Sequence, residues 1–236
     1  MRLRIRFTKH GKVRFTSHRD VARIWERAVR RSGLAVAYSE GFNPRPRLSF
    51  GLALSTGHES NAEYLDAEIA ASSAAPDIGA LPDLLTAVLP EGIEAAAVIE
   101  IDKREPSLQH TVTSCTWRID ATGVDAEQAA GAVARVLAAD EIIVTRERKG
   151  RQVVDDVRPL LLGLDVDGST EDGIRLIAEL GTQPRAIRPA ELLDALDSTL
   201  RERRVLRLHQ WTTNDNGERR EPVSQEQPLA AAQGVT

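Results

Sequence analysis

The apolar and polar positions in the N-terminal part of the chain predict alternating strands and helices. Residues 2–8 alternate strictly between apolar and polar side chains, which is typical of a strand with one buried face. Val13 and Phe15 continue this alternation after a turn and predict a short returning strand. An apolar stripe at helical spacing predicts a helix that begins after the N-cap Ser17 and ends near Ser32. Further strands are expected at 48–54, 62–70 and 93–101, and a second helix at 81–89.

The remainder of the chain repeats this order of elements. The predicted strands lie at 111–119, 160–166, 173–180 and 204–212, the predicted helices at 125–139 and from about residue 189, and a hairpin of 141–147 with 151–157 is inserted between them. Each half therefore follows the order β-α-β-β-α-β, which is the ferredoxin-like pattern.

The expected fold class is α+β, with two tandem ferredoxin-like (βαββαβ) domains and an N-terminal hairpin extension. The domains are expected at residues 1–102 and 111–212, joined by the polar, proline-bearing linker 103–110. Residues 213–236 are polar and aperiodic, which predicts a disordered C-terminal tail. A length of 236 residues suits two domains of ordinary size.

The charges of the first expected domain are segregated along the chain. Residues 1–50 carry 13 Arg and Lys against 3 Asp and Glu, and residues 51–102 carry 10 acids and no Arg or Lys, within a chain of net charge -4. In a ferredoxin-like sheet the first strand lies between the third and the fourth, so its arginines should pair with acids on both neighbours. The expected ladder joins Arg2, Arg4 and Arg6 to Asp66 and Glu68 on one side and to Glu94 and Glu100 on the other.

The basic residues left for a partner lie on the first helix and in the loop that follows it. The helix has one arginine face, and the loop at 38–47 combines aromatic and basic side chains with two prolines. Together they suit RNA, because arginines contact phosphates and aromatic rings stack on bases. The alternatives are a solvated helix face and a rigid loop whose aromatic side chains fill the core. The candidate residues are Arg19, Arg23, Arg27, Arg30 and Arg31 on the helix and Tyr38, Phe42, Asn43, Arg45 and Arg47 in the loop.

Few residues suggest catalysis or metal binding. His18 is a candidate general acid or base for RNA chemistry, and the alternative is a hydrogen-bonded histidine at a helix start. The acidic stretches at 155–156 and 165–168 are explained by solvated turns, so no metal site is predicted. The single cysteine, Cys115, excludes an internal disulfide and an iron–sulfur cluster held by this chain alone.

The sequence also limits the location and the enzyme class. It has no apolar run long enough to cross a bilayer, and its N-terminus lacks the continuous apolar segment of a signal peptide. We therefore expect a cytoplasmic protein with no membrane contact. The phosphate-loop, dinucleotide-binding, zinc-protease and serine-hydrolase motifs are absent from the sequence.

Four stretches of the first expected domain together resemble a known family. They are FTSH at 15–18, ERAVRRSGL at 26–34, YSEGFNPRP at 38–46 and EYLD at 63–66. The similarity extends more weakly into the second domain through DDVRP at 155–159 and PRAIRP at 184–189. The chain resembles the radical-SAM-linked family of unknown function, whose members are separate small proteins or are fused behind a radical SAM enzyme.

This resemblance implies a partner and not an activity. Similar proteins tend to be encoded beside a radical SAM protein and near a ribonuclease E/G-type enzyme, which implies a radical SAM enzyme as partner and RNA as ligand. The iron–sulfur cluster and SAM are then expected on the partner, with no cofactor in this chain. The leading hypothesis is a non-catalytic accessory protein that binds tRNA or rRNA for that enzyme. The alternatives are an interaction subunit that docks on the enzyme without nucleic acid, and an RNA-processing enzyme that uses His18.

Overall fold

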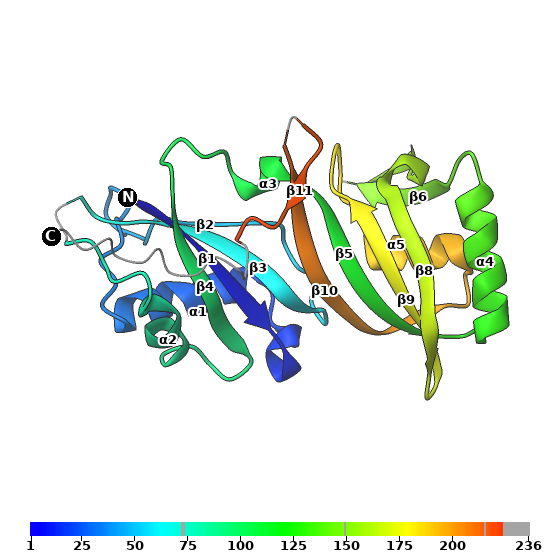
Figure 1. The fold of residues 1–236 in the computed structure, drawn as a ribbon, viewed down its shortest axis with the longest axis horizontal. Coiled ribbons are helices and arrows are strands. Elements are labelled where there is room, and N and C mark those ends of the chain that lie inside the picture. Colours follow the sequence, from blue (N-terminus) through cyan, green and yellow to red (C-terminus); the bar gives the residue numbers. More distant parts are fainter. Residues whose placement is uncertain (72–73, 149, 215, 224–236) are drawn as a thin grey trace, which may run out of the picture. The chain divides into compact units, whose positions relative to one another are not determined.

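The computed structural model describes residues 1–71, 74–148, 150–214 and 216–223, and the expected mixed α+β class is confirmed (Figure 1). Contacts within the chain divide it into two compact units. The first unit consists of residues 1–56, 62–111 and the described residues from 213 onward, and the second consists of residues 57–61 and 112–212. These boundaries differ from the expected ones at residues 57–61, at 103–110 and after residue 212.

The first unit contains the expected order of strands and helices. Along the chain these are β1 (Arg2–Lys9), α1 (His18–Arg31), β2 (Leu48–Phe50), β3 (Glu59–Glu68), α2 (Leu81–Thr86) and β4 (Ile93–Ile101). In the sheet, β1 lies between β4 and β3, and β2 pairs with β3. This arrangement places the arginine-rich first strand in a central position.

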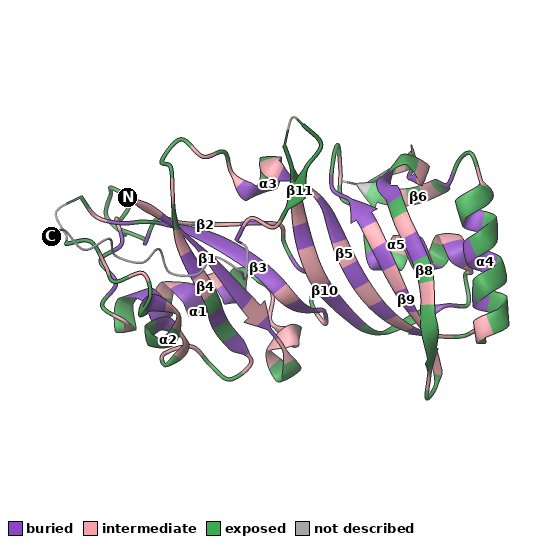
Figure 2. Cartoon of the chain, in the orientation of Figure 1, coloured by how far each residue is buried: buried purple, intermediate pink, exposed green. Residues whose placement is uncertain are grey.

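The apolar core of the first unit lies between the helices and one face of this sheet. Leu3, Ile5 and Phe7 point from β1 into the core, as their alternation predicts. Trp25 of α1 packs edge-on against Phe7, with ring centroids 5.0 Å apart. Figure 2 shows that β1 and β3 are buried along most of their length, so the opposite face of the sheet is also covered.

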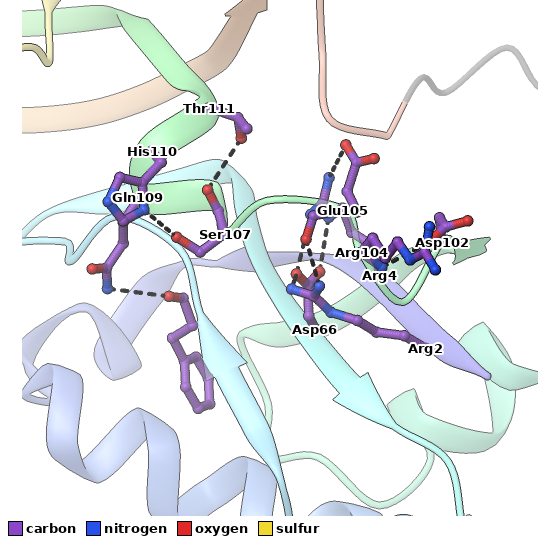
Figure 3. Close-up of polar contacts among 11 residues, drawn as sticks. Arg2, Arg4, Asp66, Asp102, Arg104, Glu105, Ser107, Gln109, His110 and Thr111 are labelled. Atoms are coloured by element: carbon purple, nitrogen blue, oxygen red, sulfur yellow. Dashed lines mark hydrogen bonds and ion pairs between the residues drawn. The ribbon is translucent and has the colours of Figure 1, made fainter.

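Buried arginines occupy that opposite, helix-free face of β1. Arg2 Nη2 and Arg4 Nε donate to the Asp66 carboxylate on β3 at 2.6 and 2.8 Å, as Figure 3 shows. This part of the predicted ladder is confirmed. Arg6 pairs instead with Glu221 at 2.7 Å, and Glu68 pairs with a loop arginine. One carboxylate of the sheet therefore serves two guanidinium groups, the buried one of Arg4 and the partly buried one of Arg2.

The predicted ion pairs with β4 are wrong, and a β-bulge in that strand accounts for Glu100. The pairing of β1 with β4 skips Ala96. Glu94 and Glu100 therefore face opposite sides of the sheet, and Glu100 lies opposite Leu3 on the core side. Neither glutamate forms an ion pair with any residue that the structure describes.

The expected N-terminal hairpin extension is a helical turn. Residues after β1 form a 3-10 helix, η1 (Gly11–Phe15), in place of the returning strand. Gly11 has a φ of 65°, a conformation that favours glycine and redirects the chain. The Lys9 ammonium group then donates to the carbonyl oxygens of Arg14 and Thr16 at 3.2 and 3.1 Å. These two bonds hold the turn closed.

The expected linker and part of the expected tail pack on the first unit. Arg2 donates to the carbonyl oxygen of Glu105 at 2.7 Å, and Leu108 is buried at the start of α3 (Leu108–Thr111). Beyond residue 212 the chain forms β11 (Arg219–Arg220), and Val223 is buried. The prediction of disorder is therefore wrong for the described residues of this segment. Its polar composition gave no sign of the tertiary contacts that order it, and residues 224–236 lie outside the described residues.

The second unit repeats the strand order of the first. Its elements are β5 (Val112–Thr122), α4 (Ala126–Ala138), β6 (Ile143–Arg148), β7 (Arg151–Asp156), η2 (Arg158–Leu160), β8 (Leu161–Thr170), β9 (Gly173–Gly181), α5 (Pro189–Leu196) and β10 (Arg201–Thr213). The sheet runs β10-β5-β9-β8 with antiparallel neighbours, and β6 and β7 form a separate two-stranded hairpin. The expected turn at Lys149 of that hairpin lies outside the described residues.

The segment 57–61 belongs to the second unit, because the first residues of β3 pair with β10. Glu59 and Ser60 lie in parallel register with Leu206 and Arg207. Glu59 also accepts a hydrogen bond from Arg204 at 2.6 Å. The apolar pattern of 62–70 predicted only the later part of this strand, since its polar beginning resembles a loop.

Replacing the shared carboxylate tests the role of the buried ion pairs. We expect Asp66→Asn to lower the free energy of unfolding by about 3 to 5 kcal/mol, because Arg4 would remain buried with its partner charge removed. Urea denaturation of the purified chain measures this change.

Glu68→Gln is the matched control for Asp66→Asn. Glu68 lies on the same strand and pairs with Arg47, but both side chains are about half-exposed. Its loss should change stability by less than about 1 kcal/mol. Equal effects of the two substitutions would contradict the assignment of Asp66 as the supporting group.

Candidate functional site

The arginine face of α1 results from the way this helix is anchored. Ser17 caps its N-terminus, with the Asp20 amide donating to Ser17 Oγ at 3.2 Å. Val21, Trp25 and Val29 are buried against the sheet. The opposite face is therefore turned to solvent, and all five predicted arginines lie exposed on it: Arg19, Arg23, Arg27, Arg30 and Arg31.

Carboxylates within the chain scarcely neutralise this face. Arg23 pairs with Asp20 at 3.3 Å, and both side chains are more than half-exposed, so the pair is weak. The other four arginines form no ion pair with any residue the structure describes. The face therefore keeps its positive charge, in contrast to the paired arginines of β1.

The loop after α1 is an ordered extension held by backbone hydrogen bonds. Gly33, with a φ of 72°, ends the helix. The Ala37 amide donates to the Glu68 carbonyl at 2.7 Å, and the Arg47 amide donates to the Ala37 carbonyl at 2.8 Å. Further out, Tyr38 and Pro46 form an isolated bridge. The two arms of the loop are thus tied to each other and to the end of β3.

The side chains at the tip of this loop point away from the core. Phe42 is fully exposed, and Tyr38 is 41% exposed. Asn43 and Arg45 are also exposed, and Arg45 forms no ion pair within the described chain. Arg47 is the exception, since it pairs with Glu68 at 3.1 Å. The hypothesis that the aromatic side chains fill the core is therefore wrong for Phe42.

Smaller apolar side chains take the core positions of this segment instead. Leu34 and Val36 precede the loop and are buried in the core of the first unit. They anchor the base of the loop, which leaves its aromatic tip free to contact a partner. The tip and the arginine face belong to the same unit, as the hypothesis of one RNA-binding surface requires.

His18 lies at the rim of a small recess. Its ring is exposed and packs edge-on against Phe50, with centroids 5.6 Å apart. The recess is also lined by Lys9 and Glu63, and its volume of about 10 Å³ holds at most one water molecule. No hydrogen bond within the described chain orients the His18 ring. The candidate acid or base therefore has neither an orienting group nor a cavity of substrate size in this structure.

The acidic pair of the second unit is engaged by arginines and backbone amides. Asp155 lies 2.9 Å from both Arg146 and Arg185, and the Arg146 hydrogen bond and nearby Arg185 charge hold the pKa of its carboxyl below the usual value. Asp156 accepts from the amides of Ile142 and Arg158, which lowers the pKa of its carboxyl. Among the described residues, no group of three or more His, Cys, Asp or Glu could hold a metal.

The two motifs of the second unit meet in space and have clear structural contacts. Arg158 donates to the carbonyl oxygens of Ala139, Leu161 and Leu137 at 3.0 to 3.2 Å. Arg185 joins Asp155 to Glu191, the latter at 3.0 Å. These contacts explain the two motifs by a structural role: Arg158 binds the end of α4, and Arg185 links the β6–β7 hairpin to α5.

Sequence reasoning missed the contribution of the chain's later segments to the first unit. Glu221 binds Arg6, and Glu105 lies 4.0 Å from Arg4. No local pattern marks either glutamate, because each acts through a contact distant in sequence. β3 carries four acids against the three arginines of β1, so a count of charges on these strands did not indicate either contact.

Comparisons with known proteins add a family and a fold. The model of a family described as uncharacterized protein conserved in bacteria (DUF2344) matches residues 2–198. No match was found among curated proteins. No helix among the described residues is long and apolar enough to span a membrane.

Several solved structures share the fold. A chain of the crystal structure of a Cbf5-Nop10-Gar1 complex is similar, with a TM-score of 0.51 and 9% sequence identity. The similarity covers 88% of this chain and 48% of that chain, so the present chain spans about half the length of this relative. At such low identity the likeness concerns the fold alone. By the extent of the family match, the chain belongs to the DUF2344 family of uncharacterized proteins conserved in bacteria.

Proposed function

We propose that the chain is a non-catalytic accessory protein of a separate radical SAM enzyme, and that its first unit binds RNA, such as tRNA or rRNA. The observation that carries the RNA proposal is the exposed arginine face of α1, on which four of five guanidinium groups have no ion pair within the described chain. Unpaired arginines on one face are a suitable electrostatic surface for a phosphate backbone.

The spacing of these arginines suits one strand of nucleic acid. Residues 19, 23, 27 and 31 are four apart, which at 1.5 Å rise per residue spaces them by about 6 Å along the helix axis. Each step of four residues also turns by about 40° around the axis, so these charges form a curved band along which the phosphates of one strand can lie. Arginine also donates two parallel hydrogen bonds to a phosphate, so each contact orients the strand as well as attracting it.

The loop supplies the second element of the proposed RNA site. Phe42 is fully exposed at the tip of a loop whose arms are joined by hydrogen bonds, so its ring is available for stacking on an unpaired base. Tyr38, Asn43 and Arg45 lie exposed in the same loop and offer further hydrogen-bond donors. These features favour single-stranded or looped RNA over a uniform duplex.

The proposal extends to the fold and to the partner. Each unit has the element order β-α-β-β-α-β and the strand order 4-1-3-2, which supports two tandem ferredoxin-like domains. The resemblance to radical-SAM-linked proteins supports a radical SAM enzyme as partner, with the iron–sulfur cluster and SAM on that enzyme. A cytoplasmic location is part of the same proposal.

The exposed Phe42 also favours a second candidate function. An aromatic side chain on a rigid loop is a common anchor in protein interfaces, where it fills a pocket of the partner. The loop would then dock on the radical SAM enzyme and α1 would contact no nucleic acid. Binding measurements with RNA and with the partner separate the two functions.

An RNA titration across salt concentrations tests the RNA proposal. We expect wild-type protein to bind single-stranded RNA with a log–log slope of about -0.7 for each phosphate contact. The double variant Arg27→Gln/Arg30→Gln should bind about tenfold more weakly, a change of about 1.4 kcal/mol, with a slope less steep by about 1.4. Fluorescence anisotropy with labelled RNA measures both quantities.

Arg203→Gln is the control for the arginine variant, because Arg203 is an exposed arginine of the second unit. It should leave affinity and slope unchanged. Absence of RNA binding at low salt, or a log–log slope near zero, would contradict the RNA proposal. Retained capture of the radical SAM partner in that case would support the docking function.

A second prediction concerns the loop aromatic. Phe42→Ala should weaken RNA binding roughly five- to a hundredfold through lost stacking, while leaving the salt slope unchanged because no phosphate contact is removed. Its stability should change by no more than about 0.5 kcal/mol, since the ring is exposed. Phe15→Ala is the matched control, because Phe15 is also exposed but lies outside the loop. Equal affinity losses in both variants would contradict a stacking role for Phe42.

A further inference from the structure

The helix-free face of the first unit carries a second row of arginines that the proposed function does not use. Arg2, Arg4 and Arg6 occupy alternate positions of β1, so they leave the strand on one side, about 7 Å apart at 3.4 Å per residue. Arg4 and Arg6 are almost completely buried. Burying a row of guanidinium groups on a central strand costs free energy, because the charges lose their hydration, and it therefore requires anionic partners.

Carboxylates that follow the strands of the first unit supply part of the negative charge that these arginines need. The strands provide Asp66, which Arg2 and Arg4 share. Glu105, in the segment after β4, lies 4.0 Å from Arg4. Glu221, directly after β11, lies 2.7 Å from Arg6. The Glu221 carboxylate reaches β1 from 215 residues further along the chain. The C-terminal segment thus supplies an anion to Arg6.

A polar group beneath this cover points to a ligand independently. Tyr64 lies two residues before Asp66 on β3, hence on the same face, and its side chain is 2% exposed. Its hydroxyl has no hydrogen-bond partner among the described residues, although buried polar groups are nearly always paired. Burial raises the pKa of this hydroxyl, so it stays protonated and can donate to an anion.

We propose that the Arg2, Arg4, Arg6 and Tyr64 face is a second binding site for the phosphodiester backbone of RNA, and that residues 216–223 mask it. The Glu221 carboxylate then occupies the place of a phosphate on Arg6. Carboxylate and phosphate offer guanidinium the same pair of acceptor oxygens, so one can replace the other. The alternate spacing of the cations along a strand favours an extended polyanion over an apolar protein surface.

The covering segment has the form of a strap. A turn precedes it, in which the Asn214 amide donates to the Glu218 carbonyl at 3.0 Å, and Gly217 adopts a φ of 79°. Glu221 and the buried Val223 follow at its far end. Because Arg4 pairs with Asp66 and not with Glu221, we expect displacement of this end to vacate the Glu221 position on Arg6 while the Arg4–Asp66 pair remains. The site can therefore open while the sheet stays intact.

The experiment uses the full chain with the α1 and loop surface disabled by Arg27→Gln, Arg30→Gln and Phe42→Ala. In this background we expect Glu221→Gln to strengthen binding of a labelled oligouridylate about tenfold, with a slope steeper by about 0.7 for each phosphate gained. Glu91→Gln, an exposed acid of the same unit, removes the same charge and should change neither quantity. Adding Arg6→Gln to the Glu221→Gln protein should cancel the gain.

Two outcomes overturn the masked site. One is unchanged affinity and slope in a folded Glu221→Gln protein, and the other is a gain that persists after Arg6→Gln. If Glu221→Gln does not fold, Glu221→Ser, which removes the same charge with a smaller polar side chain, gives the same comparison with Arg6→Gln. The RNA function of α1 is judged separately, from the loss of binding in the Arg27→Gln/Arg30→Gln protein with Glu221 intact.

Discussion

The ion pair between Arg4 and Asp66 is the contact on which the first unit depends. Both groups are buried, so each needs the other to offset the loss of water around its charge. The pair joins the central strand to β3 and fixes the register in which the apolar side chains of both strands face the helices. The same carboxylate also accepts a hydrogen bond from Arg2, which explains how a strand with three arginines lies inside a sheet.

The first unit uses arginine in two opposite ways. On β1 the guanidinium groups of Arg4 and Arg6 are buried and that of Arg2 is partly buried. Carboxylates of β3, of the 103–110 segment and of the C-terminal segment approach them. On α1 the guanidinium groups are exposed, and Asp20 is the acid that pairs with one of them. The large basic excess of the first 50 residues therefore divides into a structural part and a part available to a partner. The arginines of α1 are open to a partner as the chain stands, whereas those of β1 are covered by other parts of the first unit.

The aromatic loop shows how backbone order and side-chain exposure combine in a candidate site. Leu34 and Val36 fix the base of the loop in the core, and the bonds through Ala37 fix its arms. Phe42 is therefore presented on a positioned backbone and not on a free chain. Holding a side chain in place before binding reduces the entropy lost on contact. The recess at His18, by contrast, is too small for a substrate.

The sequence by itself determined the strands and helices with strong periodicity, such as β1, α1 and α4, because one buried face imposes a fixed spacing on apolar residues. It also identified the exposed arginines of α1, since the apolar stripe defines the opposite face. Tertiary structure alone decided the contacts of Glu100, Glu105 and Glu221. The bulge that skips Ala96 turns Glu100 away from the arginines. The chain folds back onto the first unit after β4 and after β10, which brings Glu105 and Glu221 toward them. Bulges and distant ion pairs leave no local period, so they arise only when the whole chain packs.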